Sequence, residues 1–400
     1  MIRGLVCLMV LMVAMLPSVA YAQHSELKKI RINPEAALEG KLSQYAEEVQ
    51  FIPLAAAACQ LTYILQLEVT DNHYVVLSKE CNAVLIFTRA GDFHAKIDVA
   101  KNVFRFRLTN NRQNIEVISY PDVYVYDFDG RLQLQSKLGD RPHGQFGAIR
   151  FALDDAHDVY YNTSLKTSKD SLVYQLLVYR DGKLAKSLLP YPENYRFEFI
   201  DQLGFNNFSR VYTEEDKGAY YIRNYDYQVY HLTPSSVKPV YQFIFPLTMS
   251  LPGNFATDTA LNGRRTTFMR ENIDRLIYRI NVFYRKDNLL FFSVSNHSYL
   301  YDLESSRLVN ASKLTADSLS WYLPISETGI NSRNGSVYVG FDGTWCYFSC
   351  FATSFYDRMN VERNKAGKFP EALEKFFSNR RNIRDDAVIL VRVKFKNRIL

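Results

Sequence analysis

The chain is dominated by one recurring pattern, in which two short strand-like runs are joined by a tight polar turn. The pattern is clearest over residues 114–154, where runs at 115–119, 123–127 and 132–136 are separated by Tyr-Pro-Asp and by Asp129-Gly130. Runs of about five residues that are rich in β-branched and aromatic side chains are typical of strands. Glycine in the second turn supplies the positive φ that a tight hairpin needs. The stretch therefore predicts a β-meander.

The closing hairpin of this meander returns along the chain in degenerate form. It recurs at 86–93 (IFTRAGDF), 125–132 (VYDFDGRL), 177–184 (LVYRDGKL), 229–237 (VYHLTPSSV) and 299–308 (YLYDLESSRL). Repeated four-stranded meanders that pack face to face are typical of a β-propeller. Two large β-sandwiches are the alternative, but they would not need this hairpin to return once per unit.

Counting the expected innermost strands gives the number of blades. They fall near 61–67, 103–108, 148–153, 208–213, 277–284 and 318–324, which makes six. We expect the last blade to combine 318–324 and 336–341 with 388–395 and with an N-terminal strand at 49–54. Strands from both ends would then close the ring and remove an exposed edge. The prediction is an all-β, six-bladed propeller of four-stranded antiparallel blades, forming one domain over residues 23–400.

Two further segments stand outside this repeat. Residues 370–379 (PEALEKFFSN) have proline at a helix start and apolar residues at helical spacing, so they predict one short helix. The polar loop at about 246–275 is longer than a blade connection requires. Long loops are often functional or disordered, and a functional loop would present Arg264, Arg265 and Arg270 to a ligand.

Residues 1–22 have the pattern of a secretory signal peptide: one arginine, an apolar run and the small-residue site Ala20-Tyr21-Ala22. A membrane-anchoring helix is the alternative, but the apolar run at 5–16 is shorter than the roughly 20 residues that span a bilayer. We therefore expect export to the periplasm, the cell surface or the medium, with no transmembrane segment in the mature chain.

Several short motifs resemble those of the six-bladed β-propeller proteins that Bacteroidetes export. They are the stretch FIPL at 51–54, VVLS at 75–78, the IFTRAGDF turn at 86–93, GDRPHGQF at 139–146 and the closing DDAVILVRVKFK at 385–396. The resemblance covers residues 24–400 in order. It implies the fold and export, but it implies no particular activity because such scaffolds carry many functions.

The cysteines of the mature chain leave two possibilities open. Cys59 precedes one expected strand and Cys81 follows the next, so a disulfide across the hairpin is geometrically possible in an oxidising compartment. Two free buried thiols are the alternative. Cys346 and Cys350 have no second pair or histidine cluster to complete a zinc site, so we interpret them as buried thiols.

Charge and motif content exclude some functions. The net charge is +6, and the basic residues are scattered rather than clustered, which argues against nucleic-acid binding. The sequence contains no nucleophile elbow, P-loop, EF-hand or metal-spaced histidine pair, and it identifies no cofactor. Propeller metal ligands contributed singly by several blades would form no motif, so an enzyme is not excluded. We expect a monomer.

Arginine recurs on the expected innermost strands. The candidate ligand-binding residues are Arg105, Arg107, Arg150, Arg210 and Arg279. Arginines that border a central channel would form a positive funnel for carboxylate, sulfate or phosphate groups. The alternative is that each pairs with an aspartate or a carbonyl while its stem packs between sheets.

The predicted function is an exported module that binds an anionic small molecule, a glycan or a peptide, or that binds another protein. The other possibility is a hydrolase or lyase centred on the channel and assisted by a metal. Three or more carboxylates and amides that converge on the axis would favour the enzyme. A ring of arginines and aromatic residues would favour the binding module.

Overall fold

The computed structural model describes most of the chain after residue 26. It covers residues 27–54, 59, 61, 64–78, 80–99, 103, 105–109, 112–119, 122–137, 149–154, 156–161, 173–181, 183–191, 207–210, 218–223, 225, 227–255, 257–294, 297–325, 338–378 and 387–399. The leader expected at 1–22 and the motif at 139–146 lie outside the described residues, so the signal peptide stays a prediction.

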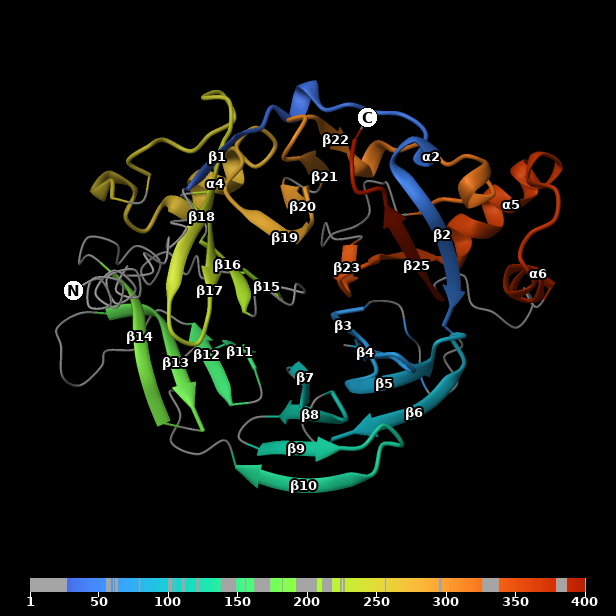
Figure 1. Cartoon of the computed structure of the whole chain (residues 1–400), viewed down its shortest axis with the longest axis horizontal. Helices are drawn as coiled ribbons and strands as arrows, with labels where there is room; N and C mark the ends of the chain where they lie inside the picture. The colour runs from blue at the N-terminus through green and yellow to red at the C-terminus, as the bar shows by residue number, and fades with distance from the viewer. Residues whose placement is uncertain are drawn as a thin grey trace, which may run out of the picture.

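Strands in the described residues form six sheets that Figure 1 shows arranged radially about a common axis. Four sheets consist of consecutive antiparallel strands, as the repeated hairpins predict. We number them blades 1, 2, 3 and 5: β3 (Gln66–Val69), β4 (His73–Ser78), β5 (Ala83–Thr88), β6 (Phe93–Asp98); β7 (Arg105–Thr109), β8 (Asn114–Ser119), β9 (Asp122–Tyr126), β10 (Leu132–Lys137); β11 (Ile149–Ala152), β12 (His157–Tyr161), β13 (Val173–Arg180), β14 (Lys183–Tyr191); β19 (Ile280–Lys286), β20 (Leu289–Val294), β21 (His297–Asp302), β22 (Leu308–Asn310).

Blade 4 carries a fifth strand. Its four antiparallel strands are β15 (Asn207–Arg210), β16 (Ala219–Arg223), β17 (Gln228–Leu232) and β18 (Val237–Ile244). The N-terminal strand β1 (Lys28–Arg31) pairs with β18 in parallel and covers the outer edge of this sheet. This blade therefore has five strands rather than the predicted four, because the N-terminal segment runs along the outer edge of blade 4 before it joins blade 6 as β2.

Blade 6 closes the ring with strands from both ends of the chain. Its order is β2 (Ala46–Pro53), β25 (Val388–Phe395), β24 (Cys346–Phe351) and β23 (Tyr338–Phe341). In the antiparallel β2–β25 pair Val49 lies opposite Val393, and Figure 1 shows the two strands side by side. This confirms the predicted closure, in which residues far apart in sequence share the last sheet.

One strand assignment within blade 6 is wrong. Residues 318–324 do not form the innermost strand; they contain the 3-10 helix η5 (Ser318–Ser320). The Asp317 carboxylate accepts a hydrogen bond from the Leu319 backbone N–H, and Trp321 adopts a positive φ of 51°, so the chain turns here. The innermost strand is β23, which lies within the strand predicted at 336–341. The fourth strand of the blade is β24, which was not predicted.

The described helices are few and lie outside the sheets. They are α2 (Leu42–Tyr45), α4 (Arg265–Glu271), α5 (Ala352–Ala366), α6 (Glu371–Ser378) and the 3-10 turns η1 (Pro34–Ala36), η3 (Thr259–Leu261) and η4 (Ala311–Lys313). The helix predicted at 370–379 is α6, which buries Leu373, Phe376 and Phe377. Its longer neighbour α5 was not predicted, and both flank blade 6 (Figure 1).

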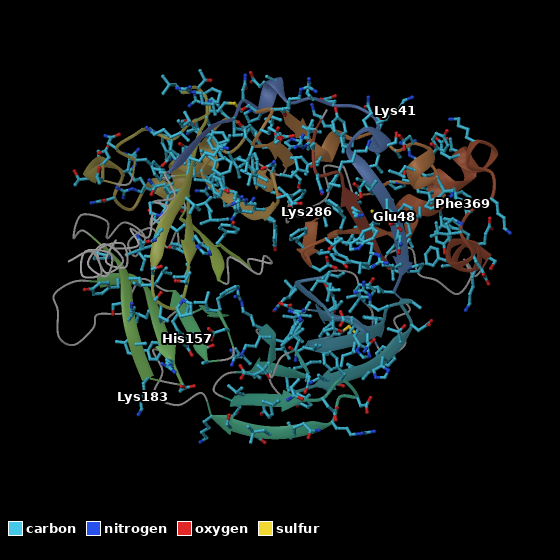
Figure 2. All side chains as sticks on the ribbon, viewed as in Figure 1. Lys41, Glu48, His157, Lys183, Lys286 and Phe369 are labelled. Carbon is cyan, nitrogen blue, oxygen red and sulfur yellow. A yellow bond between two sulfur atoms is a disulfide. The ribbon has the colours of Figure 1, made fainter. Side chains whose placement is uncertain are left out.

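Aromatic side chains fill the wedges between blades, as the composition indicates. Between blades 4 and 5, Tyr220 meets Phe283 with ring centroids 4.9 Å apart, and Phe243 meets Phe292 at 4.9 Å. Both contacts are edge-to-face, an arrangement that the ring quadrupoles favour. Figure 2 shows described side chains in the space between neighbouring sheets, most densely among blades 1, 5 and 6.

The described cysteines fall into two pairs with different fates. Cys59 and Cys81 form a disulfide with a Cα–Cα distance of 5.8 Å, between the segment before β3 and the turn after β4. Cys346 and Cys350 are buried thiols on β24 and are not part of a disulfide. Within the described residues, no helix is both long and apolar enough to cross a membrane.

Candidate ligand pocket at one end of the propeller axis

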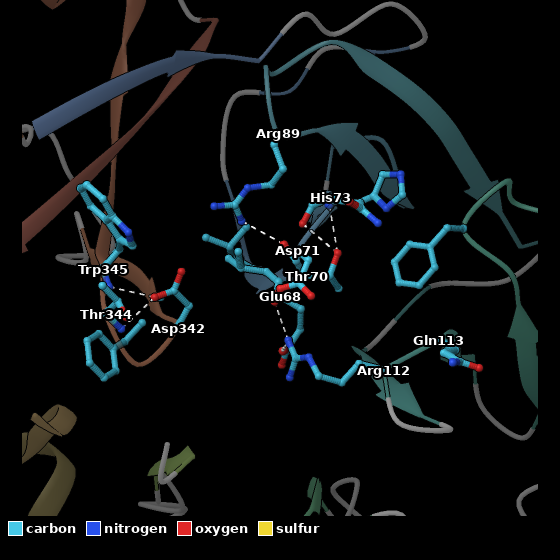
Figure 3. Close-up of a pocket in the computed structure, with 16 residues that line it drawn as sticks. Glu68, Thr70, Asp71, His73, Arg89, Arg112, Gln113, Asp342, Thr344 and Trp345 are labelled. Carbon is cyan, nitrogen blue, oxygen red and sulfur yellow. Dashed lines mark hydrogen bonds and ion pairs between the residues drawn. The ribbon is translucent and has the colours of Figure 1, made fainter. Parts of the chain in front are cut away.

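A pocket of about 990 Å³ lies where blades 1, 2 and 6 meet, and we call it the mouth pocket. Its wall contains the innermost strands β3 and β23 near their C-terminal ends. The turns that follow these strands, together with the turns β5–β6, β7–β8 and β9–β10, complete it. The pocket therefore lies at the end of the propeller where the innermost strands β3 and β23 finish, and Figure 3 shows the residues that line it.

Two arginines in the mouth pocket are held by backbone carbonyls at the end of β3 and in the β3–β4 turn. Arg89 donates from Nη1 to the Thr70 carbonyl at 3.0 Å, and its Cζ lies 4.4 Å from the centroid of the Tyr74 ring. Arg112 donates from Nη2 to the Val69 carbonyl and forms a 3.6 Å ion pair with Glu68. A guanidinium carries five N–H donors, so each retains donors beyond these contacts.

The β23–β24 turn contributes a carboxylate and an indole to the opposite wall. Asp342 Oδ1 accepts hydrogen bonds from the backbone N–H groups of Thr344 (3.0 Å) and Trp345 (2.8 Å). Asp342 Oδ2 accepts one from the Tyr347 hydroxyl at 2.5 Å. Gly343 adopts a φ of +98°, a conformation that favours glycine, and this tight turn places Asp342 and Trp345 side by side.

Histidine 73 forms part of the rim on the blade 2 side. Its ring stacks on Phe128 with a centroid distance of 5.0 Å and an interplanar angle of 11°. His94 lies 4.9 Å away and contacts Asp129. Burial, and secondarily the nearby His94, lowers the pKa of His73, so its imidazole is neutral at physiological pH.

Two buried phenols lie beneath the pocket between blades 1 and 6. The rings of Tyr74 and Tyr347 meet edge to face at 6.0 Å. Burial raises the pKa of both, and for Tyr347 the Asp342 carboxylate raises it further. The Tyr74 hydroxyl is buried and has no hydrogen-bond partner among the described residues. These phenols stay protonated at neutral pH, so Tyr347 acts as a hydrogen-bond donor that orients Asp342.

The arginines that the sequence proposed as a ligand site are only partly described, and those that are described lie in different surroundings. Arg107 donates from Nε to Glu116 (2.8 Å) and from Nη1 to Asp158 of blade 3 (2.9 Å), so its guanidinium clamps two blades. Arg105 is exposed on β7. Arg150 and Arg210 lie on innermost strands, but their side chains lie outside the described part of the chain. That these arginines bind an anion together stays a prediction.

Arg279, the fifth candidate, lines a smaller pocket of about 520 Å³ with Arg275, His297 and Lys313. Its Cζ lies 5.3 Å from the Tyr278 ring centroid. Residue 279 precedes β19 and His297 begins β21, so this pocket lies on the face of the ring opposite the mouth pocket.

The loop at 246–275 is a packed insertion. Leu251, Phe255 and Leu276 form a small buried cluster. Arg265 is 1% exposed and donates to the backbone carbonyls of Phe255 (2.9 Å) and Asp258 and to the side chain of Asn262 (2.9 Å). Arg265 therefore holds the insertion together, whereas Arg264 and Arg270 lie at its surface.

The mouth pocket residues were not singled out from the sequence. Arg89 lies in the turn IFTRAGDF, and Asp342-Gly343 is an Asp-Gly turn like that at 129–130, so hairpin-turn positions were the available signal. Among the described residues, no group of three histidine, cysteine, aspartate or glutamate side chains is placed to hold a metal ion.

A closed ring of six radially arranged sheets defines a six-bladed β-propeller. The chain belongs to the DUF5128 family, described as a 6-bladed β-propeller, whose model matches residues 21–334. A crystal structure of a Bacteroides fragilis protein proposed to be exported is similar, with a TM-score of 0.65 and 16% identity over 92% of this chain and 100% of that one. These findings confirm the resemblance to the Bacteroidetes propellers.

Two further structures align with lower scores. A DUF4221 protein from Bacteroides vulgatus has a TM-score of 0.44 and 11% identity, covering 88% of this chain and 97% of that one. Virginiamycin B lyase from Staphylococcus aureus has a TM-score of 0.36 and 10% identity, covering 87% and 99%. Among curated protein sequences, none matches the chain.

Proposed function

We propose that this propeller is a ligand-binding module and that its ligand occupies the mouth pocket. The observation that carries this proposal is a cavity of about 990 Å³ into which guanidinium groups, carboxylates and an indole all project. Small-molecule sites occupy roughly 300–1,000 Å³ and combine apolar walls with a few placed polar groups. The mouth pocket lies at the upper end of this range.

The scaffold holds these polar groups in place before any ligand arrives. The Arg89 guanidinium is fixed by the Thr70 carbonyl and the Tyr74 ring, and the Asp342 carboxylate is fixed by two backbone N–H groups and Tyr347. Side chains that are already ordered lose little conformational entropy on binding, so their contacts contribute to affinity. Turns on a rigid sheet framework are the usual location of such sites.

We further propose that the protein acts outside the cytoplasm. The signal-peptide pattern at 1–22 and the similarity to a Bacteroides fragilis protein proposed to be exported support this location. The disulfide between Cys59 and Cys81 is of the kind that persists in oxidising compartments.

A thermal-shift screen tests the ligand-binding role. The mature protein is heated with anionic sugars, neutral oligosaccharides, dicarboxylates, amino acids and dipeptides. A ligand at 100 times its Kd stabilises the folded state by about 2.7 kcal/mol and raises Tm accordingly. Trp345 gives a second signal: with Trp321 replaced by phenylalanine it is the only tryptophan, since the chain has two, and its emission should change on binding.

A pocket-filling variant gives the matched control. Thr344 is exposed in the pocket wall, so Thr344→Trp adds bulk there and should abolish the ligand's Tm shift. Leu247→Trp adds the same group at a position that is 93% exposed and does not line the pocket, and should leave the shift intact. If no compound class shifts the Tm of the wild-type protein, or if the shift survives Thr344→Trp, the proposed function is wrong.

A further inference from the structure

Two half-buried side chains of opposite charge project into the mouth pocket, and neither has a counter-ion among the described residues. Arg89 contacts a backbone carbonyl and an aromatic ring, and Asp342 accepts hydrogen bonds from two backbone N–H groups and a phenol. Within the described chain neither forms an ion pair with the other or with any other residue. Figure 3 shows the two groups on facing walls, with the Trp345 indole beside Asp342.

Unpaired charges in a partly dry site are unfavourable until a partner arrives. A carboxylate matches the planar fork of the Arg89 guanidinium and can form two parallel hydrogen bonds with it. An ammonium group matches Asp342, whose two oxygens offer about four acceptor positions while three are in use. A ligand that carries both groups would neutralise both walls together.

The remaining charges of the pocket do not favour a simple anion. Arg112 is already paired with Glu68, and Asp71 lies exposed at the rim. The His73 ring lies on the far side, stacked on Phe128. An anion bound to Arg89 alone would therefore sit near an uncompensated Asp342, whereas a zwitterion would not.

Trp345 adds a preference for a flat or apolar group. The Arg392 guanidinium covers one face of its indole at 4.5 Å, and Arg392 is itself anchored to Gln50 by a 3.0 Å hydrogen bond. The indole also lines the mouth pocket, so the surface that it offers a ligand is the one away from Arg392. Apolar and aromatic groups pack favourably on such a surface.

We propose that the mouth pocket binds an amino acid or short peptide as a zwitterion. In this arrangement the ligand's carboxylate binds Arg89, its ammonium binds Asp342 and an apolar or aromatic side chain packs on Trp345. The inference rests on the proposed function and specifies the ligand class for the same pocket.

Calorimetric titration with matched ligands tests directly whether both charged ends of the ligand contribute to binding. The probes are phenylalanine and phenylalanylglycine, each compared with its N-acetylated and C-amidated forms. Blocking either end should weaken binding by at least about tenfold, because one charged contact is lost. Alanylglycine should bind more weakly than phenylalanylglycine. The tighter of the two unblocked probes shows whether the site is built for a free amino acid or for a peptide.

Two charge-removing variants then assign each end of the ligand. Arg89→Gln should weaken the zwitterion about tenfold and should make binding insensitive to C-amidation. Asp342→Asn, whose amide can keep the turn's hydrogen bonds, should make binding insensitive to N-acetylation. Arg307→Gln is the control, because this exposed arginine lies in the β21–β22 turn of blade 5 and does not line the pocket.

The outcomes separate this inference from the proposed function. The assignment is supported if Arg89→Gln loses only its sensitivity to C-amidation and Asp342→Asn loses only its sensitivity to N-acetylation. General damage to the fold would instead weaken the binding of all probes equally. If a screened ligand is blocked by Thr344→Trp but the end-blocked probes bind as tightly as the free ones, the zwitterion inference is wrong and the binding role stands. If no probe and no screened ligand binds, both are wrong.

Discussion

Replacing Arg107 distinguishes a structural clamp from a ligand contact. Its guanidinium donates to both oxygens of Glu116 at 2.8 and 3.1 Å and to Asp158 at 2.9 Å, and the three side chains are 15%, 11% and 9% exposed. Glu116 lies on β8 of blade 2 and Asp158 on β12 of blade 3. Arg107→Ala would leave two carboxylates largely buried without their shared cation.

Removing one partner of a buried ion pair typically destabilises a protein by about 3–5 kcal/mol. With an unfolding entropy of roughly 2.1 cal/mol/K per residue and 400 residues, this free energy corresponds to a fall in Tm of about 4–6 °C. Differential scanning calorimetry measures this shift. Arg105→Ala, two positions along the same strand and exposed, should change Tm by less than about 1 °C.

A second background tests the physical cause. In a Glu116→Gln, Asp158→Asn protein the two carboxylates are absent, so Arg107→Ala should cost much less than it does in the wild-type protein. The difference between the two costs is the coupling energy of the clamp. If Arg107→Ala leaves Tm unchanged but abolishes the binding of an anionic ligand, the clamp interpretation is refuted and the funnel prediction gains support.

Three further perturbations follow from the described contacts. Replacing both Cys59 and Cys81 with serine should lower the free energy of unfolding by about 3 kcal/mol in a urea titration, because the disulfide spans 22 residues; an unchanged midpoint would contradict this. Because the pKa of His73 is lowered in the folded state, protonation favours the unfolded chain. Its contribution to stability should therefore be full above pH 6.5, the ordinary value, and should fall at lower pH. An NMR titration of the ring should give a midpoint below 6.5, and a higher one would refute the assignment. Arg265→Met should speed amide hydrogen exchange within the insertion at 246–275, whereas Arg264→Met at the exposed neighbour should not; equal exchange in the two variants would exclude the anchoring role.

The fold could be predicted from local signals and from the two chain ends. Asp-Gly turns and alternating runs specify each hairpin through short-range backbone preferences, which is why the order of strands within most blades followed from the sequence. The incompleteness of the last blade predicted that a strand near 49–54 and one near 388–395 would share a sheet, and β2 and β25 do. Residues 318–324 were wrongly predicted as the innermost strand of blade 6, because Asp317 caps a 3-10 helix at the start of this stretch.

The candidate site could not be predicted in the same way. The clamp around Arg107 depends on Asp158, which lies 51 positions further along the chain on a different blade. Likewise Arg89 and Asp342 come together only because the ring closes and brings blade 6 beside blade 1. Sequence patterns report which face of a strand is buried, but they do not report which turns of different blades become neighbours.

A crystal structure of the protein soaked with phenylalanylglycine tests the central claim most directly. The account predicts ligand density in the mouth pocket, with the carboxylate on the Arg89 guanidinium, the ammonium on Asp342 and the phenyl ring against Trp345. Ligand bound in the pocket beside Arg279 on the opposite face of the ring, or a mouth pocket that stays empty at saturating ligand, would contradict it.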